Sequence, residues 1–306
     1  MIDKISFLPD EDLAPRFVVQ ALSEIADWGL VSTGIPEAHK YTKGEGITVA
    51  VLDTGVPNHS DLQGNILAGF NTTDESSEFD MQGHGTHVSG IIAALENGVG
   101  VVGVAPQARI LPIKVLGDNG LSGWGEIEKG VMLAINSKVD IINLSLGSPV
   151  LPPESFHDVI KEATSKGIIV ISAAGNNFSS VAYPAAYDEV IAVAATDKMG
   201  NVADFSSPGP QVHIGAPGVN IYSTYLNNLY AMLCGTSQAA PFISGVCALI
   251  LSWTRQNPGV PPISNTQEML AKLDEISSSA GSIGSSDKIY FGIPHLANFM
   301  PWKDIK

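Results

Sequence analysis

The segment Ile47-Thr48-Val49-Ala50-Val51-Leu52-Asp53-Thr54-Gly55 carries an almost unbroken aliphatic run directly into an acidic residue and a glycine. Similar aliphatic runs occur at residues 110–116, 141–146, 168–173 and 190–194. Strands that are buried on both faces have this composition, because they need no alternating polar positions. Residues 85–95 and 155–166, which lie between the runs, carry apolar side chains at helical spacing. The pattern predicts an α/β fold with a mostly parallel central sheet and helices on both faces.

Polar residues and glycine follow the aliphatic runs. Asp53 comes after the first run, residues 145–147 (Ser-Leu-Gly) close the third, and Gly175-Asn176 stands shortly after the fourth. In an open parallel sheet, ligands bind beyond the carboxyl ends of the strands. We therefore expect a functional site at that edge of the sheet, completed by residues at the starts of helices.

Composition narrows the class of protein. The chain has 306 residues, 44% of them hydrophobic and 15% charged, so disorder caused by low hydrophobicity is not expected, and we interpret the chain as one main domain. The net charge of −15 disfavours binding to nucleic acid or to anionic membrane surfaces. No run of about 18 residues is continuously apolar, so no membrane span is predicted.

The N-terminal residues and the cysteines bear on the expected compartment. The sequence begins MIDKISFLPDED, which lacks the basic and then apolar regions of a secretory signal. Cys234 and Cys247 are too few for a disulfide framework and are expected to be reduced. Both features favour a cytoplasmic location.

Two segments place a reactive side chain beside glycine at the expected start of a helix, residues 83–90 with His84 and residues 235–241 with Ser237. A serine hydroxyl is a weak nucleophile, so it needs a histidine to take its proton and a carboxylate to hold the imidazole. Asp53 supplies that carboxylate, and the order Asp, His, Ser along the chain is one of the known triad orders. The three residues are therefore predicted to form a catalytic triad.

Residues 49–55, 84–90 and 235–241 strongly resemble the three active-site signatures of subtilisin-like serine proteases. The resemblance implies a subtilisin-like three-layer α/β fold. It also implies a serine endopeptidase that hydrolyses peptide bonds through an acyl-enzyme intermediate. By position, it assigns the orienting carboxylate, the general base, the nucleophile and the oxyanion donor to Asp53, His84, Ser237 and Asn176, respectively.

The resemblance further implies that a protein or peptide substrate binds as an added strand between two segments of the chain. Ala182 stands near the base of the primary pocket, where many relatives carry glycine, so we expect medium-sized apolar side chains to fit better than Phe or Tyr. For Trp124, a place in the core is an equally good interpretation. The residues assigned to substrate binding are Ser122, Gly123, Trp124, Ser145, Leu146, Gly147, Ala174, Gly175 and Ala182.

Relatives in this family commonly bind structural Ca²⁺, and residues 95–101 together with Asp61 resemble their strongest site. Alternating side-chain and carbonyl oxygens suit such a hard cation. The implied ligands are Asp61, Leu95, Asn97, Val99 and Val101, while Asp197 lies where some relatives bind a weaker ion.

About 26 residues precede the likeness to the family core, as in intracellular subtilisins. This implies that residues 1–26 are an inhibitory propeptide and residues 27–306 the catalytic domain. Phe7, Leu8 and Pro9 partly match a motif that covers the active site of those relatives until it is cut off. A proline in a bound strand cannot donate a hydrogen bond, which would hold the nearest peptide bond away from Ser237. Intracellular relatives are often dimers, so a homodimer is expected by analogy.

Two other interpretations use the same motifs. A narrow maturation protease, such as the leader peptidases of lanthipeptide pathways, would cut one defined precursor and leave casein intact. A non-catalytic subtilase-like binding protein is disfavoured, because every triad residue type and Asn176 are present; labelling of Ser237 by a fluorophosphonate would exclude it. His87 is expected to be a structural helper of the site rather than a metal ligand.

Overall fold

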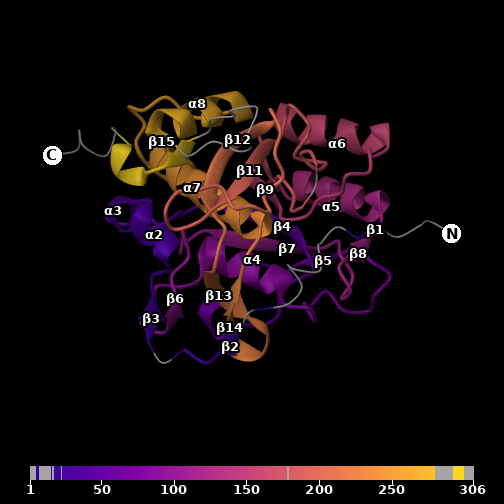
Figure 1. Ribbon diagram of the computed structural model, residues 1–306, viewed down its shortest axis with the longest axis horizontal. Coiled ribbons are helices and arrows are strands. Elements are labelled where there is room, and N and C mark those ends of the chain that lie inside the picture. Colours follow the sequence, from indigo (N-terminus) through magenta and orange to yellow (C-terminus); the bar gives the residue numbers. More distant parts are fainter. Residues whose placement is uncertain are drawn as a thin grey trace.

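The computed structural model describes residues 5–6, 15, 17–21, 23–177, 179–279 and 292–299 of the chain. Its centre is a nine-stranded sheet with the order β15-β16-β12-β11-β10-β9-β4-β7-β5 (Figure 1). Neighbouring strands from β16 to β5 all run parallel, and β15 is antiparallel to β16. The strands are β4 (Thr48–Asp53), β5 (Phe70–Asn71), β7 (Arg109–Lys114), β9 (Ile141–Leu144), β10 (Ile169–Ala173), β11 (Ile191–Thr196), β12 (Val212–Pro217), β15 (Ser277–Ser279) and β16 (Gly292–Pro294).

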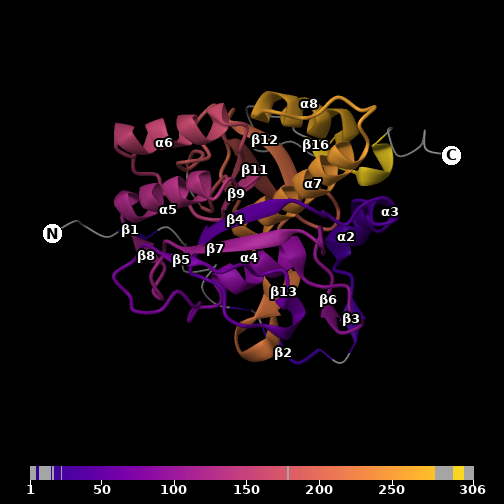
Figure 2. The ribbon, with the colours of Figure 1, turned by 180° about the vertical axis from the view of Figure 1, so that it is seen from behind.

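Alternate residues of β4 serve two separate cores. Val49 and Val51 pack in a cluster with α4 (His84–Ala93) and α7 (Thr236–Gln256) on one face of the sheet. Ala50 and Leu52 pack in a second cluster with α5 (Trp124–Asn136) and α6 (Glu154–Ser165), which lie side by side in both views (Figures 1 and 2). Because both faces are covered, the strand is aliphatic throughout, and the predicted three-layer α/β fold is confirmed.

The remaining helices lie around this frame. The short helices α2 (Trp28–Ser32) and α3 (Ile35–Ala38) precede the sheet, and α8 (Thr266–Ile276) follows α7. The Asp27 carboxylate accepts a hydrogen bond from the Gly29 N–H at 3.0 Å, and this bond caps α2. Among the described residues, α7 is long and apolar enough to cross a membrane, but its apolar window is fully buried inside the protein.

Three smaller sheets involve the described N-terminal residues. β1 (Ile5–Ser6) pairs antiparallel with β8 (Leu121–Ser122), and β3 (Glu24–Ile25) pairs parallel with β6 (Gly100–Val101). β2 (Val18–Val19) pairs antiparallel with β14 (Leu229–Leu233), which also pairs with β13 (Ile221–Tyr225). The N-terminal segment therefore adds short strands to edges of the main body. Phe7, Leu8 and Pro9, in which an inhibitory motif is predicted, lie outside the described residues.

Candidate active site

The carboxyl edge of the sheet carries a buried aspartate and histidine in contact. Asp53 ends β4, and His84 is the first residue of α4. His84 Nδ1 lies 2.8 Å from Asp53 Oδ1, and neither side chain is exposed. The same carboxylate oxygen accepts the Thr54 N–H at 2.8 Å. The carboxylate is therefore fixed by two donors and favours the imidazole tautomer with the proton on Nδ1, which leaves Nε2 as the basic nitrogen.

This contact needs an unusually close approach between α4 and the turn after β4. A Cβ at Gly85 would lie 2.2 Å from the carbonyl oxygen of Gly55 and 3.2 Å from the Cβ of Asp53. Only glycine leaves room at such a distance. The glycine after His84 is therefore explained by the approach of backbone to backbone.

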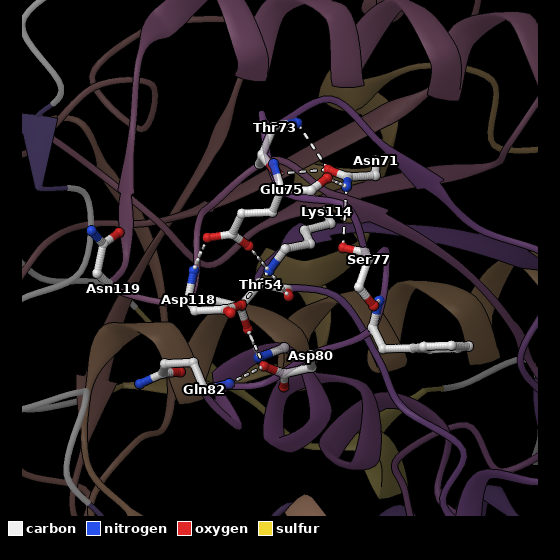
Figure 3. A network of polar contacts seen from close by, with 12 residues as sticks. Thr54, Asn71, Thr73, Glu75, Ser77, Asp80, Gln82, Lys114, Asp118 and Asn119 are labelled. Atoms are coloured by element: carbon white, nitrogen blue, oxygen red, sulfur yellow. Dashed lines mark hydrogen bonds and ion pairs between the residues drawn. The ribbon is translucent and has the colours of Figure 1, made fainter.

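Asp80 organises the first turn of α4 and was not identified from the sequence. Its Oδ1 accepts a hydrogen bond from Thr54 Oγ1 at 2.9 Å (Figure 3). The same oxygen accepts the Gly83 N–H at 2.7 Å, and Oδ2 accepts the Thr86 N–H at 3.0 Å and Thr86 Oγ1 at 2.6 Å. Thr54 Oγ1 in turn accepts the Gly85 N–H at 2.9 Å. An acidic residue shortly before a glycine-led helix start is a weak capping signal, and the sequence showed nothing that linked it to the turn after β4.

Ser237 lies in the first turn of α7 beside Asn176. Asn176 Oδ1 accepts hydrogen bonds from the Thr236 N–H at 3.0 Å and Thr236 Oγ1 at 2.9 Å. These two bonds orient the amide so that its Nδ2 group points away from Thr236. The positive end of the α7 dipole also faces this position, which favours negative charge. The arrangement suits the stabilisation of an oxyanion at the start of α7.

A buried hydrogen-bond chain from β9 supports the helix turn that carries Ser237. Asn143 Nδ2 donates to Ser145 Oγ at 2.9 Å, and Ser145 Oγ donates to the Ser237 carbonyl at 2.9 Å. Ser244 Oγ donates to Asn143 Oδ1 at 2.8 Å, which closes the chain back onto α7. Ser145, assigned to substrate binding, therefore also positions the turn that carries Ser237.

The other predicted substrate residues lie in two places around this edge. Ser122 is in β8, followed by Gly123 and by Trp124 at the start of α5, and Trp124 packs against Phe156 with ring centroids 4.8 Å apart. Trp124 is 7% exposed and belongs to the α5–α6 core cluster, so a core role accounts for most of its surface.

Gly147, Ala174 and Ala182 come together as one wall. The Ala182 N–H donates to the Ala174 carbonyl at 2.9 Å, and a Cβ at Gly147 would lie 3.0 Å from the Ala182 Cβ. Leu146 and Gly175 adjoin them in the chain. Ala174 and Ala182 are both fully buried, so the Ala182 methyl group packs against the backbone of Gly147.

The predicted cation site centres on a buried carboxylate. Asp61 is 2% exposed, and its carboxylate accepts from Asn97 Nδ2 and the Val101 N–H, each at 2.9 Å. Burial raises the pKa of Asp61, and the nearby charge of Glu24 raises it further. Glu24 Oε2 accepts the Asn97 and Gly98 N–H groups at 2.6 and 2.8 Å. Glu24 was missed because it lies far from the loop in the sequence.

The residues around this carboxylate carry oxygen atoms of several kinds: the carboxylates of Asp61 and Glu24, the Asn97 amide, and the carbonyl groups of residues 95–101, which include Leu95 and Val99. The Asn97 amide turns its Nδ2 group toward Asp61, and its oxygen accepts the Val99 N–H at 3.0 Å. Oxygen donors of these kinds are the ligands that Ca²⁺ prefers. The Asp197 carboxylate instead accepts the Met199 and Asn201 N–H groups at 2.8 and 2.9 Å within its own turn.

Comparisons with known proteins agree with this geometry. Residues 44–277 match the family model described as the subtilase family. Subtilisin BL of Lederbergia lenta is 43% identical over 263 residues, which cover 85% of this chain and 93% of that protein. The alkaline protease of Shouchella clausii is 41% identical over 88% of this chain and 68% of its own length. A thermostable alkaline protease of Halalkalibacterium halodurans is 44% identical over 76% of this chain and 64% of its own length.

His87, one turn after His84, joins α4 to the β13–β14 pair. Its Nε2 lies 3.2 Å from the Ile221 carbonyl and 3.1 Å from the Ala231 carbonyl, so a neutral ring with the proton on Nε2 satisfies this position. Burial, with a smaller contribution from the charge of His84, lowers the pKa of His87 to about 3. The folded protein therefore keeps His87 neutral at acidities where the unfolded chain is protonated.

This difference predicts acid sensitivity. Because the pKa of His87 in the folded protein lies below the usual histidine value of about 6.5, the stabilisation from His87 is complete above pH 6.5 and is lost as the pH falls toward about 3. Between pH 6.5 and 4.5 the loss amounts to about 2 kcal/mol. Urea unfolding of the inactive Ser237→Ala protein at both pH values measures it. His87→Gln, which keeps a donor for both carbonyls, should remove most of the loss, and His157→Gln, at a partly exposed position of α6, is the matched control. An equal acid loss in His87→Gln would contradict the prediction.

Proposed function

The chain belongs to the subtilase family and is a subtilisin-like serine endopeptidase, and from the geometry of its site we propose how individual residues carry out the reaction. Ser237 Oγ attacks the carbonyl carbon of the peptide bond while His84 Nε2 takes the hydroxyl proton. His84 then gives that proton to the leaving amine, and an acyl-enzyme remains on Ser237. A water molecule, deprotonated by His84, hydrolyses the acyl-enzyme.

The observation that carries this proposal is the buried contact of 2.8 Å between His84 Nδ1 and Asp53 Oδ1. The carboxylate stabilises the imidazolium that forms when His84 holds the serine proton. Asn176 Nδ2 and the Ser237 N–H would donate to the oxyanion, because Thr236 turns the amide oxygen of Asn176 away from that position.

Removal of the Asn176 amide should slow the chemical step. We expect Asn176→Ala to lower kcat by about 10²- to 10³-fold with a small change in KM, because the donor acts mainly on the developing oxyanion. Peptide hydrolysis with active sites counted by a fluorophosphonate measures the effect, and Ser237→Ala gives the background. A kcat within a factor of two of the unmodified enzyme would exclude this role.

Primary specificity is proposed from the wall formed by Gly147, Ala174 and Ala182. The Ala182 methyl group shortens the pocket, so Leu, Met or Val before the cut should be preferred over Phe or Tyr. A peptide library with mass spectrometry of the cut sites measures the preference, and Ala182→Gly should shift it toward Phe. A profile dominated by Phe in the unmodified enzyme would contradict the proposal.

The N-terminal segment is proposed to inhibit the enzyme. β1 pairs Ile5 with Ser122 and Ser6 with Leu121 of β8, a strand assigned to substrate binding. β2 pairs with β14, which ends four residues before Ser237, and the Met232 N–H donates to the Phe17 carbonyl at 3.4 Å. Residues 7–16, which join these two strands, include Phe7, Leu8 and Pro9. The pairing of β1 with β8, a strand assigned to substrate binding, supports a segment that excludes substrate in an unprocessed zymogen.

Deletion of residues 1–22 should raise initial activity, because it frees β8 and β14 while it keeps Glu24. We expect an increase of at least about 10-fold over the unprocessed full chain in the first minutes of a peptide assay. A synthetic peptide of residues 1–22, added in trans, should restore inhibition, and a scrambled peptide is the control. Equal initial rates of the two proteins would refute self-inhibition.

A structural Ca²⁺ is proposed at Asp61 and Glu24, with oxygen ligands from residues 95–101. When bound, the ion would tie β3 and the loop before β6 to the main body and would supply no catalytic chemistry. The buried carboxylate of Asp61, beside a second carboxylate, supports the proposal.

Chelation should lower the thermal stability of the protein. A ligand present at about 100 times its Kd contributes about 2.7 kcal/mol, so EDTA should reduce Tm by several degrees in the Ser237→Ala background. Asp61→Asn should abolish the response to Ca²⁺, and Asp158→Asn, on the surface of α6, should keep it. No difference between Ca²⁺ and EDTA in the unmodified chain would contradict the site.

A cytoplasmic location and a homodimer are proposed from the likeness to intracellular relatives. The free thiols of Cys234 and Cys247 support a reducing compartment. Cell fractionation tests the location, and sedimentation equilibrium of the Ser237→Ala protein tests the dimer; recovery outside the cell, or a monomer at micromolar concentration, would contradict the respective proposal.

A further inference from the structure

A fully buried lysine lies at the carboxyl edge of the sheet, next to the candidate triad. Lys114 ends β7, and its side chain is 0% exposed. Its ammonium donates to the Thr54 carbonyl at 2.9 Å and to Asp118 Oδ1 at 2.8 Å, and it forms an ion pair with Glu75 Oε2 at 3.0 Å (Figure 3). The three acceptors match the three protons of the ammonium.

A contribution to stability alone does not explain why a lysine occupies position 114. Burial of an ammonium carries a large desolvation penalty, and apolar side chains of similar volume often replace buried ion pairs without loss of stability. The other residues of β7 from Ile110 to Ile113 are apolar and buried. Lys114 is also the register partner of Asp53 across β4 and β7. A charged group at this one position therefore indicates a role in the adjoining site.

One arm of the network reaches the triad. Thr54, whose carbonyl accepts from Lys114, donates its N–H to Asp53 Oδ1 at 2.8 Å. Its Oγ1 accepts the N–H of Gly85, the residue after His84, at 2.9 Å. Thr54 is thus bonded to both segments that carry the Asp53–His84 pair, and Lys114 fixes its carbonyl.

The second arm reaches the strand assigned to substrate. Asp118 lies in the turn before β8, and this turn is closed by hydrogen bonds from the Gly117 N–H to the Leu121 carbonyl at 2.9 Å and from the Gly120 N–H to the Gly117 carbonyl at 2.8 Å. The position of β8 therefore depends on the turn that Asp118 anchors to Lys114.

Glu75 fastens the same turn from a third segment. Its Oε1 accepts the Asp118 N–H at 2.9 Å, and its Oε2 pairs with Lys114. Partial burial acts to raise the pKa of Glu75, but the Asp118 N–H and the Lys114 ammonium outweigh it and lower the pKa. Asn71 shapes this loop by donating to the Glu75 carbonyl at 2.7 Å.

We propose that Lys114 is a positioning residue that links β8 to the turn carrying Asp53, so that pairing of an extended peptide with β8 improves the placement of the triad. The inference rests on the proposal that substrates pair with β8. Binding energy from substrate residues far from the cut would then appear as a higher kcat, as well as a lower KM. Lys114 itself touches neither the substrate nor the reacting atoms.

The test compares two substrates with the same leaving group, an acylated leucine p-nitroanilide and the same compound extended by three alanines. The full chain is incubated until its activity is constant, so that the proposed inhibitory segment no longer occupies β8. Active sites are then counted by a fluorophosphonate, so that misfolded protein is excluded. The quantity measured is the gain in kcat from the short to the long substrate. In Lys114→Met we expect this gain to fall by about 3- to 30-fold, the range of coupling changes seen for residues between sites.

Controls separate coupling from stability. Lys161→Met removes an exposed lysine of α6, whose nitrogen lies 3.8 Å from Asp158, and should keep the gain. Asp118→Ala, at a side chain that is 46% exposed, breaks the arm to β8 and should reduce the gain even if Lys114→Met fails to fold. A normal gain in either folded variant, with the unmodified enzyme showing one, would overturn the role of Lys114 and leave the proposed function standing. No gain in the unmodified enzyme would overturn both this inference and substrate pairing with β8.

Discussion

The hydrogen bond between His84 and Asp53 constrains the backbone around it. It requires the first turn of α4 to lie against the end of β4, with backbone atoms so close that residue 85 must be glycine. Asp80 holds that helix turn through its two carboxylate oxygens, and Thr54 bonds to both sides of the contact. The orientation of His84, the proposed general base, therefore depends on the backbone positions of the turn after β4 and of the first turn of α4.

Several charged side chains are buried at or near the contact between His84 and Asp53, although burial disfavours their charged forms. Asp53, Asp80 and Lys114 are each at most 2% exposed. Asp80 and Lys114 are surrounded by hydrogen-bond partners, and Asp53 Oδ1 accepts two hydrogen bonds, so hydrogen bonds within the protein partly offset the desolvation penalty. A preorganised polar site of this kind changes little when charge develops in the transition state, which is the condition that electrostatic stabilisation requires.

Substrate binding and the proposed self-inhibition would use the same backbone groups. β8 and β14 are edge segments that accept another strand, and in this structure β1 and β2 of the N-terminal segment occupy them. An edge strand recognises a partner through main-chain hydrogen bonds, so a segment of the chain itself can occupy the groups that an unrelated peptide would use. Both the proposed self-inhibition and the proposed link from β8 through Lys114 to Asp53 depend on the position of β8.

The sequence by itself determined the sheet and its two helical layers, and it predicted the three members of the candidate triad. Aliphatic runs and glycine at the start of a helix are local sequence patterns. Such patterns indicate which segments are buried and which backbone conformation they adopt. Glu24, Asp80 and Lys114 left no comparable signal, because each acts through partners that only folding brings near. Asp53 and Lys114 are 61 positions apart and become neighbours through the register of two parallel strands. Such registers depend on the packing of the whole sheet, so the network that supports the site was decided by the tertiary structure.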